Sequence, residues 1–203
     1  SATFINRIIK ATGGYNYFVD NALTNVLRVE YDYQTGENLG ALIEGPSTNL
    51  ALYSEQLDNA AWTAQDGAAV TANAIVSPDL TTTADKIDFS TDINGIVAQS
   101  VAATASPTGT FTFSIWLKAD SPQVIIIRIG NNINSQSTIN VTTDWKKFEV
   151  TGTGTGSQSV SSPQLRNSSA SAKTVYAWGA QYEELSFATS YIKTEGAAVS
   201  RSS

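Results

Sequence analysis

The sequence predicts an all-β protein, an antiparallel jelly-roll β-sandwich, from three observations: residues that alternate with period two, turn signals between them, and almost no helix-like segment. The chain has 203 residues, 41% of them hydrophobic. A chain of this length can bury a core as one domain of moderate size. Short strands separated by regularly spaced turns are typical of β-sandwiches.

The clearest strand lies at residues 111–118. Its apolar members are Phe111, Phe113, Ile115 and Leu117, and they alternate with Thr112, Ser114, Trp116 and Lys118. This period places one set of side chains in the core and the other set on the outside. Shorter alternations predict further strands around Ile87 and Phe89, Ile96 to Val101, Ile139 and Val141, Phe148 and Val150, and Val175 and Ala177.

Turn residues separate these predicted strands. The strongest signals are Ser77-Pro78-Asp79, Asn94-Gly95, Ser106-Pro107-Thr108-Gly109, Asp120-Ser121-Pro122, Gly130-Asn131-Asn132 and the run from Gly152 to Gly156. Each combines residues that favour tight turns over helices or strands. The only helical turn expected is around Glu55 to Ala61.

Residues 1–46 behave differently and predict an N-terminal arm, with the sandwich in residues 47–203. Leu27–Tyr33 is expected to pair with Leu39–Glu44 as a hairpin, with Gly36 supplying a positive φ in the turn. An isolated hairpin is marginal in water, so the arm should pack on the sandwich or on a neighbouring chain. Tyr31 and Tyr33 are its candidate assembly contacts.

Composition excludes several function classes. The chain has no histidine and no cysteine, which removes the commonest general base and the usual zinc ligands. Its net charge is −6 and it has no basic cluster, so neither nucleic acid nor an anionic membrane is an expected partner. No run approaches the length of a membrane span. We therefore expect a protein that is not an enzyme.

Two segments carry a resemblance to a known family. The first runs from Thr48 to Trp62, TNLALYSEQLDNAAW, and the second from Tyr176 to Thr194, YAWGAQYEELSFATSYIKT. With Asp32-Tyr33, Thr35-Gly36-Glu37 and Leu42-Ile43-Glu44 before them, they resemble bacteriophage tail-fibre, tail-spike and head-fibre proteins. Those proteins carry a jelly-roll domain similar to carbohydrate-binding modules. The chain departs from the pattern at Pro46-Ser47, where an Arg usually precedes Thr-Asn-Leu, and at Lys193, where a Pro is common.

The resemblance implies a non-enzymatic structural component on the surface of the phage particle. Its partners would be other virion proteins, and it would form a homo-oligomer, with a trimer expected by family analogy. Similar modules often hold a structural Ca²⁺ and otherwise no cofactor, and Glu183 is the candidate ligand here. A glycan of the host or the environment is the expected ligand of such a module.

The candidate contact surface comes from strand alternation. If Phe113 and Ile115 face the core, Trp116 faces outward, beside the outward residues of the next strand along the chain. That strand, Val124–Ile129, is apolar on both faces, so its outer side should be covered. Trp116, Ile126 and Arg128 then define a patch, and Asn140 and Gln181 could add hydrogen bonds to sugar hydroxyls.

Two functions remain open for this patch. It could bind sugar, or Ile126 and Trp116 could be covered by the arm or by an identical neighbour in a purely architectural capsid or tail module. Trp62, Trp145 and Trp178 are expected in the core. The neighbouring Glu183 and Glu184 point to opposite faces of a strand and so cannot act together as glycosidase carboxylates.

Overall fold

The computed structural model describes residues 44–102 and 108–202, together with the backbone of four short N-terminal strands. These strands are β1 (Arg7–Ala11), β2 (Gly14–Phe18), β3 (Val29–Tyr31) and β4 (Asn38–Ala41). Among the described residues no helix is long and apolar enough to cross a membrane.

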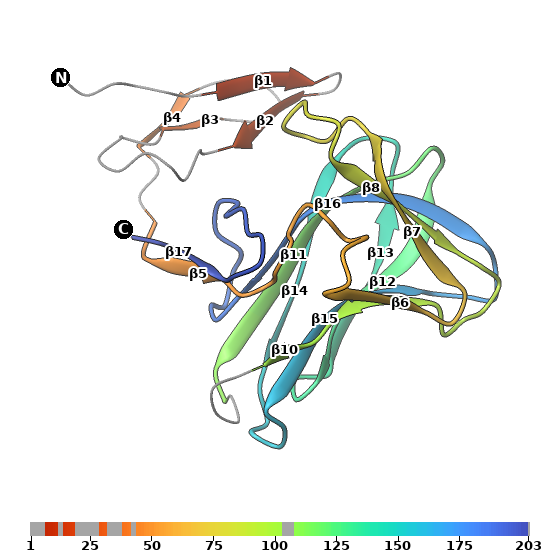
Figure 1. The fold of residues 1–203 in the computed structure, drawn as a ribbon. Helices are drawn as coiled ribbons and strands as arrows, with labels where there is room; N and C mark the ends of the chain where they lie inside the picture. The colour runs from red at the N-terminus through yellow and green to blue at the C-terminus, as the bar shows by residue number, and fades with distance from the viewer. Residues whose placement is uncertain are drawn as a thin grey trace.

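The rest of the described chain forms two packed antiparallel sheets (Figure 1). One, here called the β12 sheet, has the order β13-β12-β15-β9-β6, with β10 beside β15. Its strands are β6 (Trp62–Gln65), β9 (Ile96–Gln99), β10 (Val101–Ala102), β12 (Gln123–Asn131), β13 (Ser135–Val141) and β15 (Val160–Asn167). The other, the β16 sheet, has the order β14-β11-β16-β8-β7. Its strands are β7 (Ala68–Ile75), β8 (Ala84–Phe89), β11 (Thr110–Lys118), β14 (Lys146–Thr153) and β16 (Lys173–Glu183).

The core lies between the sheets, as the alternation predicts. Phe113, Ile115 and Leu117 of β11 are fully buried, and so are Ile125, Ile127 and Ile129 of β12. Trp62 is buried with them, whereas Trp178 is buried on the outer side of β16. The prediction for Trp145 is wrong, because this residue is half-exposed and its indole N–H donates to the carbonyl of Val76.

The predicted fold class is confirmed: the chain is an all-β sandwich with jelly-roll connections. Successive strands repeatedly change sheet, and β11 belongs to the β16 sheet while β12 belongs to the other. The prediction that residues 111–118 and 124–129 are neighbours in one sheet is therefore wrong. Sequence order and spatial order differ because the turn after β11 crosses the sandwich.

The N-terminal strands form two hairpins. β3 pairs with β4, with Val29 opposite Ala41, as the sequence predicts. The pairing of β1 with β2 was not predicted, because residues 11–25 show no steady alternation. Tyr31 lies in β3, but its side chain and the whole of Tyr33 fall outside the described residues. Their assembly role and the boundary at residue 46 stay predictions.

The last segment of the chain returns across the outer face of the β16 sheet. Its final strand, β17 (Val199–Arg201), pairs with β5 (Ser47–Asn49), and the two lie side by side in Figure 1. Arg201 also forms an ion pair of 3.0 Å with Glu44. This arrangement gives the two sheets different surroundings, because one outer face of the sandwich carries this C-terminal segment.

Candidate functional site

The predicted site residues divide between the two outer faces of the sandwich. Trp116, Gln181 and Glu183 lie on the outer side of the β16 sheet. Ile126, Arg128 and Asn140 lie on the outer side of the β12 sheet. Because a sandwich core separates these faces, the six residues cannot form one site.

Gln181 is fully engaged inside the protein. It is 1% exposed, and its side-chain N–H groups lie within hydrogen-bond distance of Glu183, of Thr189 and of the Ser190 carbonyl. Its side-chain oxygen accepts from the backbone N–H of Ile192 at 2.6 Å. A ligand could reach Gln181 only if the C-terminal segment moved away.

Glu183 is likewise surrounded by donors. Its carboxylate accepts hydrogen bonds from the hydroxyls of Ser47 and Thr189, from the Thr189 backbone N–H and from Gln181. A Ca²⁺ site needs several oxygen ligands, usually with more than one carboxylate. Among the described residues no group of three or more acidic, histidine or cysteine side chains is placed to hold a metal. In this structure Glu183 anchors the C-terminal segment.

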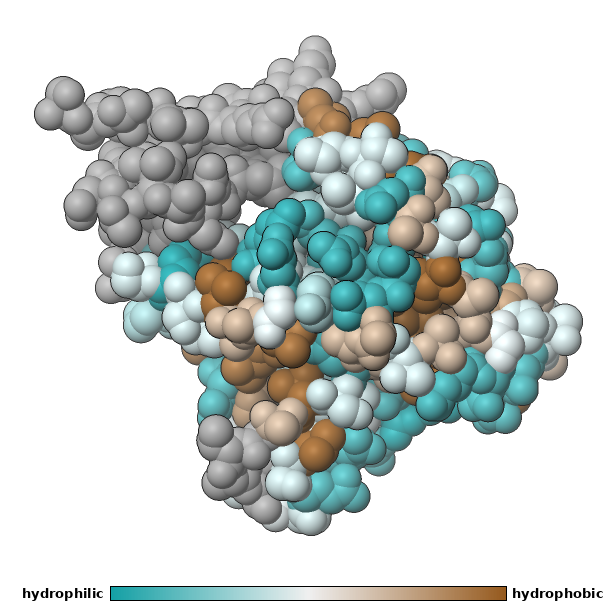
Figure 2. Space-filling model, in the orientation of Figure 1, coloured by the Kyte–Doolittle hydropathy of each residue, from teal (hydrophilic) through white to brown (hydrophobic). Residues whose placement is uncertain are grey.

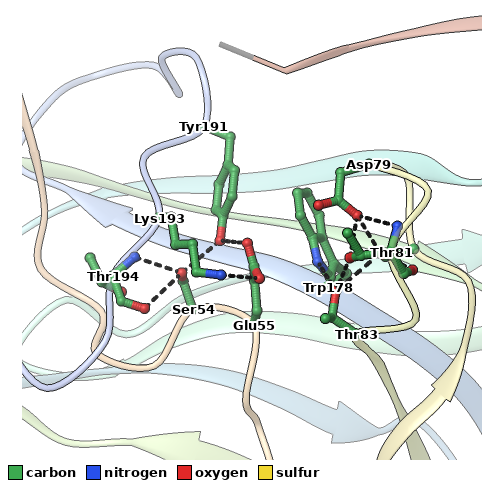
Figure 3. Close-up of polar contacts among 10 residues, drawn as sticks. Ser54, Glu55, Asp79, Thr81, Thr83, Trp178, Tyr191, Lys193 and Thr194 are labelled. Carbon is green, nitrogen blue, oxygen red and sulfur yellow. Dashed lines mark hydrogen bonds and ion pairs between the residues drawn. The ribbon is translucent and has the colours of Figure 1, made fainter. Parts of the chain in front are cut away.

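Trp116 is half-buried against the same segment. It lies opposite Trp178 on β16, and Tyr191 packs on Trp178 with ring centroids 4.6 Å apart. Figure 3 shows Tyr191 beside Ser54 and Glu55. The ammonium group of Lys193 donates a hydrogen bond of 2.8 Å to the carboxylate of Glu55. Burial is the main cause of the raised pKa of Tyr191, and the negative charge of the nearby Glu55 raises this pKa further. Through these contacts the C-terminal segment packs on the β16 sheet in the region around Trp116.

The outer face of the β12 sheet is built differently. On this face no described segment forms a pair of strands like that of β5 and β17 on the other outer face. The outward residues follow from the register of β13, β12, β15, β9 and β6. None of these outward residues is acidic, and most are polar. They are Gln136, Thr138 and Asn140 of β13, Val124, Ile126 and Arg128 of β12, Ser162, Gln164 and Arg166 of β15, Ile96 and Ala98 of β9, and Thr63 and Gln65 of β6.

Arg128 and Gln164 form the centre of this face. They are register partners on β12 and β15, and Gly130 provides room, since a side chain there would clash with the amide of Gln164. One guanidinium nitrogen of Arg128 donates to Asn134. However, Nε of Arg128 and Oε1 of Gln164 are buried without a hydrogen-bond partner. Such unsatisfied groups are uncommon in proteins and call for an explanation.

Arg166 adds a second positive charge next to this centre. It lies opposite Ile126, two residues along β15 from Gln164, and is half-buried. Burial lowers the pKa of Arg128, and the charge of Arg166 lowers it further. Within the part of the chain that the structure describes, neither arginine has an acidic partner.

Sequence reasoning missed Gln164 and Arg166 because their strand is hard to recognise. The segment Val160–Asn167 reads VSSPQLRN, with a proline and little apolar alternation. Proline is tolerated here because the neighbouring strand is interrupted: β15 pairs with β10 up to Ser161 and with β9 from Gln164 onward. The alternation of Gln164, Leu165 and Arg166, with only Leu165 in the core, was the available signal.

Comparison with known proteins identifies the fold. No family model and no curated protein matches the chain. The tandem CBM22-1-CBM22-2 domain from Paenibacillus barcinonensis Xyn10C aligns with a TM-score of 0.55 and 15% identity, over 72% of this chain and 49% of that one. The CBM22-1 xylan-binding domain of the same protein gives 0.53 and 16%, over 72% of this chain and 100% of that one.

A third similar structure is the enzymatically active domain of tailspike protein 4 from bacteriophage CBA120. It has a TM-score of 0.49 and 17% identity, over 66% of this chain, which spans 21% of that one. At such identities the first two likenesses show the fold alone. The chain therefore has the jelly-roll fold of carbohydrate-binding modules.

Proposed function

We propose that this protein is a non-catalytic glycan-binding module whose contact surface is the outer face of the β12 sheet. The observation that carries the proposal is the central pair, Arg128 and Gln164, with polar groups left unsatisfied on a face free of acidic side chains. Amide and guanidinium groups on a rigid sheet can bond adjacent sugar hydroxyls. Ile126 and Ile96 flank Arg166 on the two neighbouring strands and offer apolar area on either side of it for the C–H face of a sugar ring.

The absence of catalysis is part of the proposal. Hydrolysis of a glycosidic bond needs two carboxyl groups that flank it. Glu183 is buried and hydrogen-bonded, and its neighbour Glu184 is exposed in the bend that follows β16. The proposed contact face carries no carboxylate.

The proposed setting is the surface of a bacteriophage particle. It is supported by the resemblance of the segments 48–62 and 176–194 to virion fibre proteins. The two segments contact each other, through Asn49 with Tyr182 and through Ser54 with Tyr191. In such a setting many copies with weak affinity per site would bind by avidity.

The test is a titration of neutral and acidic oligosaccharides into the purified chain, followed by nuclear magnetic resonance or calorimetry. We expect binding in the micromolar to millimolar range, weakened about tenfold or more by Arg128→Ala and also weakened by Asn140→Ala. Lys146→Ala, an exposed cation on the other sheet, is the matched control and should bind like the wild type. Absence of binding to every glycan at millimolar concentration would refute the proposal.

An architectural role is the alternative, favoured by one observation on the same face. Val124 is 44% exposed and stands next to the half-buried Ile126 on β12, so a protein could cover both. The face of the molecule in Figure 2 shows hydrophobic residues in small groups among hydrophilic ones. An assembly contact predicts a defined oligomer in light scattering that Ile126→Asp disrupts, whereas the glycan proposal predicts an unchanged oligomeric state.

A further inference from the structure

We infer that the outer face of the β12 sheet selects acidic sugars, namely glycans whose units carry a carboxylate, through Arg128 and Arg166. This inference rests on the proposed function and adds the class of ligand to it.

The two arginines are diagonal neighbours on adjacent strands. Arg128 of β12 lies opposite Gln164 of β15. Arg166, two residues after Gln164, lies opposite Ile126, which is two residues before Arg128. Diagonal side chains of this kind are roughly 7–8 Å apart at Cα and within reach of each other when long. Two guanidinium groups at that separation can hold one carboxylate between them or bind two neighbouring ones.

The face lacks the charge that would normally balance them. Like charges placed close together are unfavourable, and burial of Arg128 adds to that cost. The chain as a whole has a net charge of −6, so acidic residues are plentiful elsewhere. The ion pairs within the described part of the chain use Glu44, Glu55 and Asp88 instead. A bound anion would supply the missing partner.

Gln164 argues for a sugar acid over a bare anion. Its side-chain oxygen needs a donor, and only 8% of the residue is exposed. Sulfate has acceptors only, whereas a sugar acid carries hydroxyl donors beside its carboxylate. Use of this buried oxygen requires a rotation of the Gln164 amide, which packs directly over Gly130.

The experiment compares acidic oligosaccharides with neutral counterparts. Three pairs are titrated at low salt: oligogalacturonate and its methyl ester, oligomannuronate and oligomannose, and sialyllactose and lactose. We expect at least one acid to bind tenfold or more tightly than its counterpart, with the preference reduced at high salt. Arg166→Gln should abolish the preference for the acid, while Lys146→Gln, on the other sheet, should preserve it.

The possible failures are distinguishable. If glycans bind and Arg128→Ala weakens them, but no acid exceeds its neutral counterpart, the inference is overturned and the proposed function stands. If inorganic phosphate or a single-stranded oligonucleotide binds more tightly than every acidic sugar, the site is a general anion site and the inference is overturned. If no glycan binds at all, the proposed function fails as well.

Discussion

At the scale of single residues, Gly179 shows how a local distortion positions the covered face. Between the pairs Ser114–Gln181 and Trp116–Trp178, β16 contains one residue more than β11, which is a β-bulge. Gly179 has a φ of +67°, in the left-handed region that side chains disfavour. The bulge turns Trp178 and Gln181 toward the same outer face, where the C-terminal segment covers both.

Gly179→Ala should therefore destabilise the fold by about 1–2 kcal/mol, from the left-handed backbone alone. The added methyl would also lie 3.3 Å from Trp116 and 3.4 Å from Tyr191. Urea denaturation followed by tryptophan fluorescence measures this loss. Gly45→Ala, with nothing within 4 Å, is the control and should leave the midpoint almost unchanged. Equal effects of the two changes would contradict the strain argument.

Asp85 is the residue from which a pH dependence follows. It is 1% exposed at the start of β8 and accepts backbone hydrogen bonds from Leu57 at 2.6 Å and Asn73 at 2.9 Å. Burial is the main cause that raises its pKa from 3.8 to about 6, with a contribution from the Asp58 charge, against the lowering effect of the hydrogen bonds. The folded state thus holds this proton more tightly than the unfolded state does.

Because the folded pKa is the higher one, the stability linked to Asp85 is full below pH 4 and falls as the pH rises to 6 and above. The loss amounts to about 3 kcal/mol at most. Asp85→Asn removes the titration, so the stability advantage of the wild type over this variant should shrink between pH 4 and pH 7. Denaturant titrations at both pH values test this. An advantage that stays constant between the two pH values would contradict the raised pKa.

At the scale of elements, Asn49 links the beginning and the end of the sandwich. Its side-chain N–H groups donate to the carbonyls of Ala180 and Ile192, and its oxygen accepts from the N–H groups of Ala51 and Tyr182. All four hydrogen-bonding positions of the amide are thus filled, in a residue that is 0% exposed. Asn49 thus connects Thr48-Asn49-Leu50 with the segment after Tyr176.

Asn49→Ala would leave these buried backbone groups without partners, at roughly 1–3 kcal/mol each. We expect a loss of at least about 3 kcal/mol in unfolding free energy, measured by chemical denaturation. Asn94→Ala, at an exposed turn, serves as the comparison and should lose less than about 0.5 kcal/mol. A small loss for Asn49→Ala would show that the amide is replaceable.

The elements also show what the sequence could and could not predict. Strands with a strong period of two, above all β11, were predicted with the correct buried face, because apolar residues occupy every second position on the face that is buried. β15 was missed because polar residues fill its outer positions and proline interrupts it. The candidate site wrongly grouped residues from two outer faces. Alternation assigns a side chain to a face of its own sheet, whereas only the path of the chain assigns a strand to a sheet.

At the scale of the whole molecule, the C-terminal segment completes the sandwich. It supplies Tyr191 to Trp178, and Thr189 to Glu183 and Gln181. The carbonyl of Thr189 also accepts from the ammonium group of Lys147 at 2.8 Å, and burial lowers the pKa of that lysine. Without the segment, polar groups and aromatic rings that are now buried would face water.

A chain shortened after Leu185 should therefore lose cooperative unfolding or fail to remain soluble. Removal of Ser202 and Ser203 alone should have no effect, because neither residue belongs to β17. Thermal unfolding followed by circular dichroism compares the two truncations. A shortened chain with an unchanged melting temperature would mean that the segment is an accessory and not part of the fold.

The pairing of β5 with β17 has a further consequence for the route of the chain. Ser47 and Arg201 are register partners, so the places where the sandwich is entered and left lie about 5 Å apart. A linker of a few residues could join them, with new ends opened in the exposed Ser90–Asn94 loop, to give a circular permutant with the same core. For the same reason, the chain enters the sandwich before Ser47 and leaves it after Arg201 at one corner.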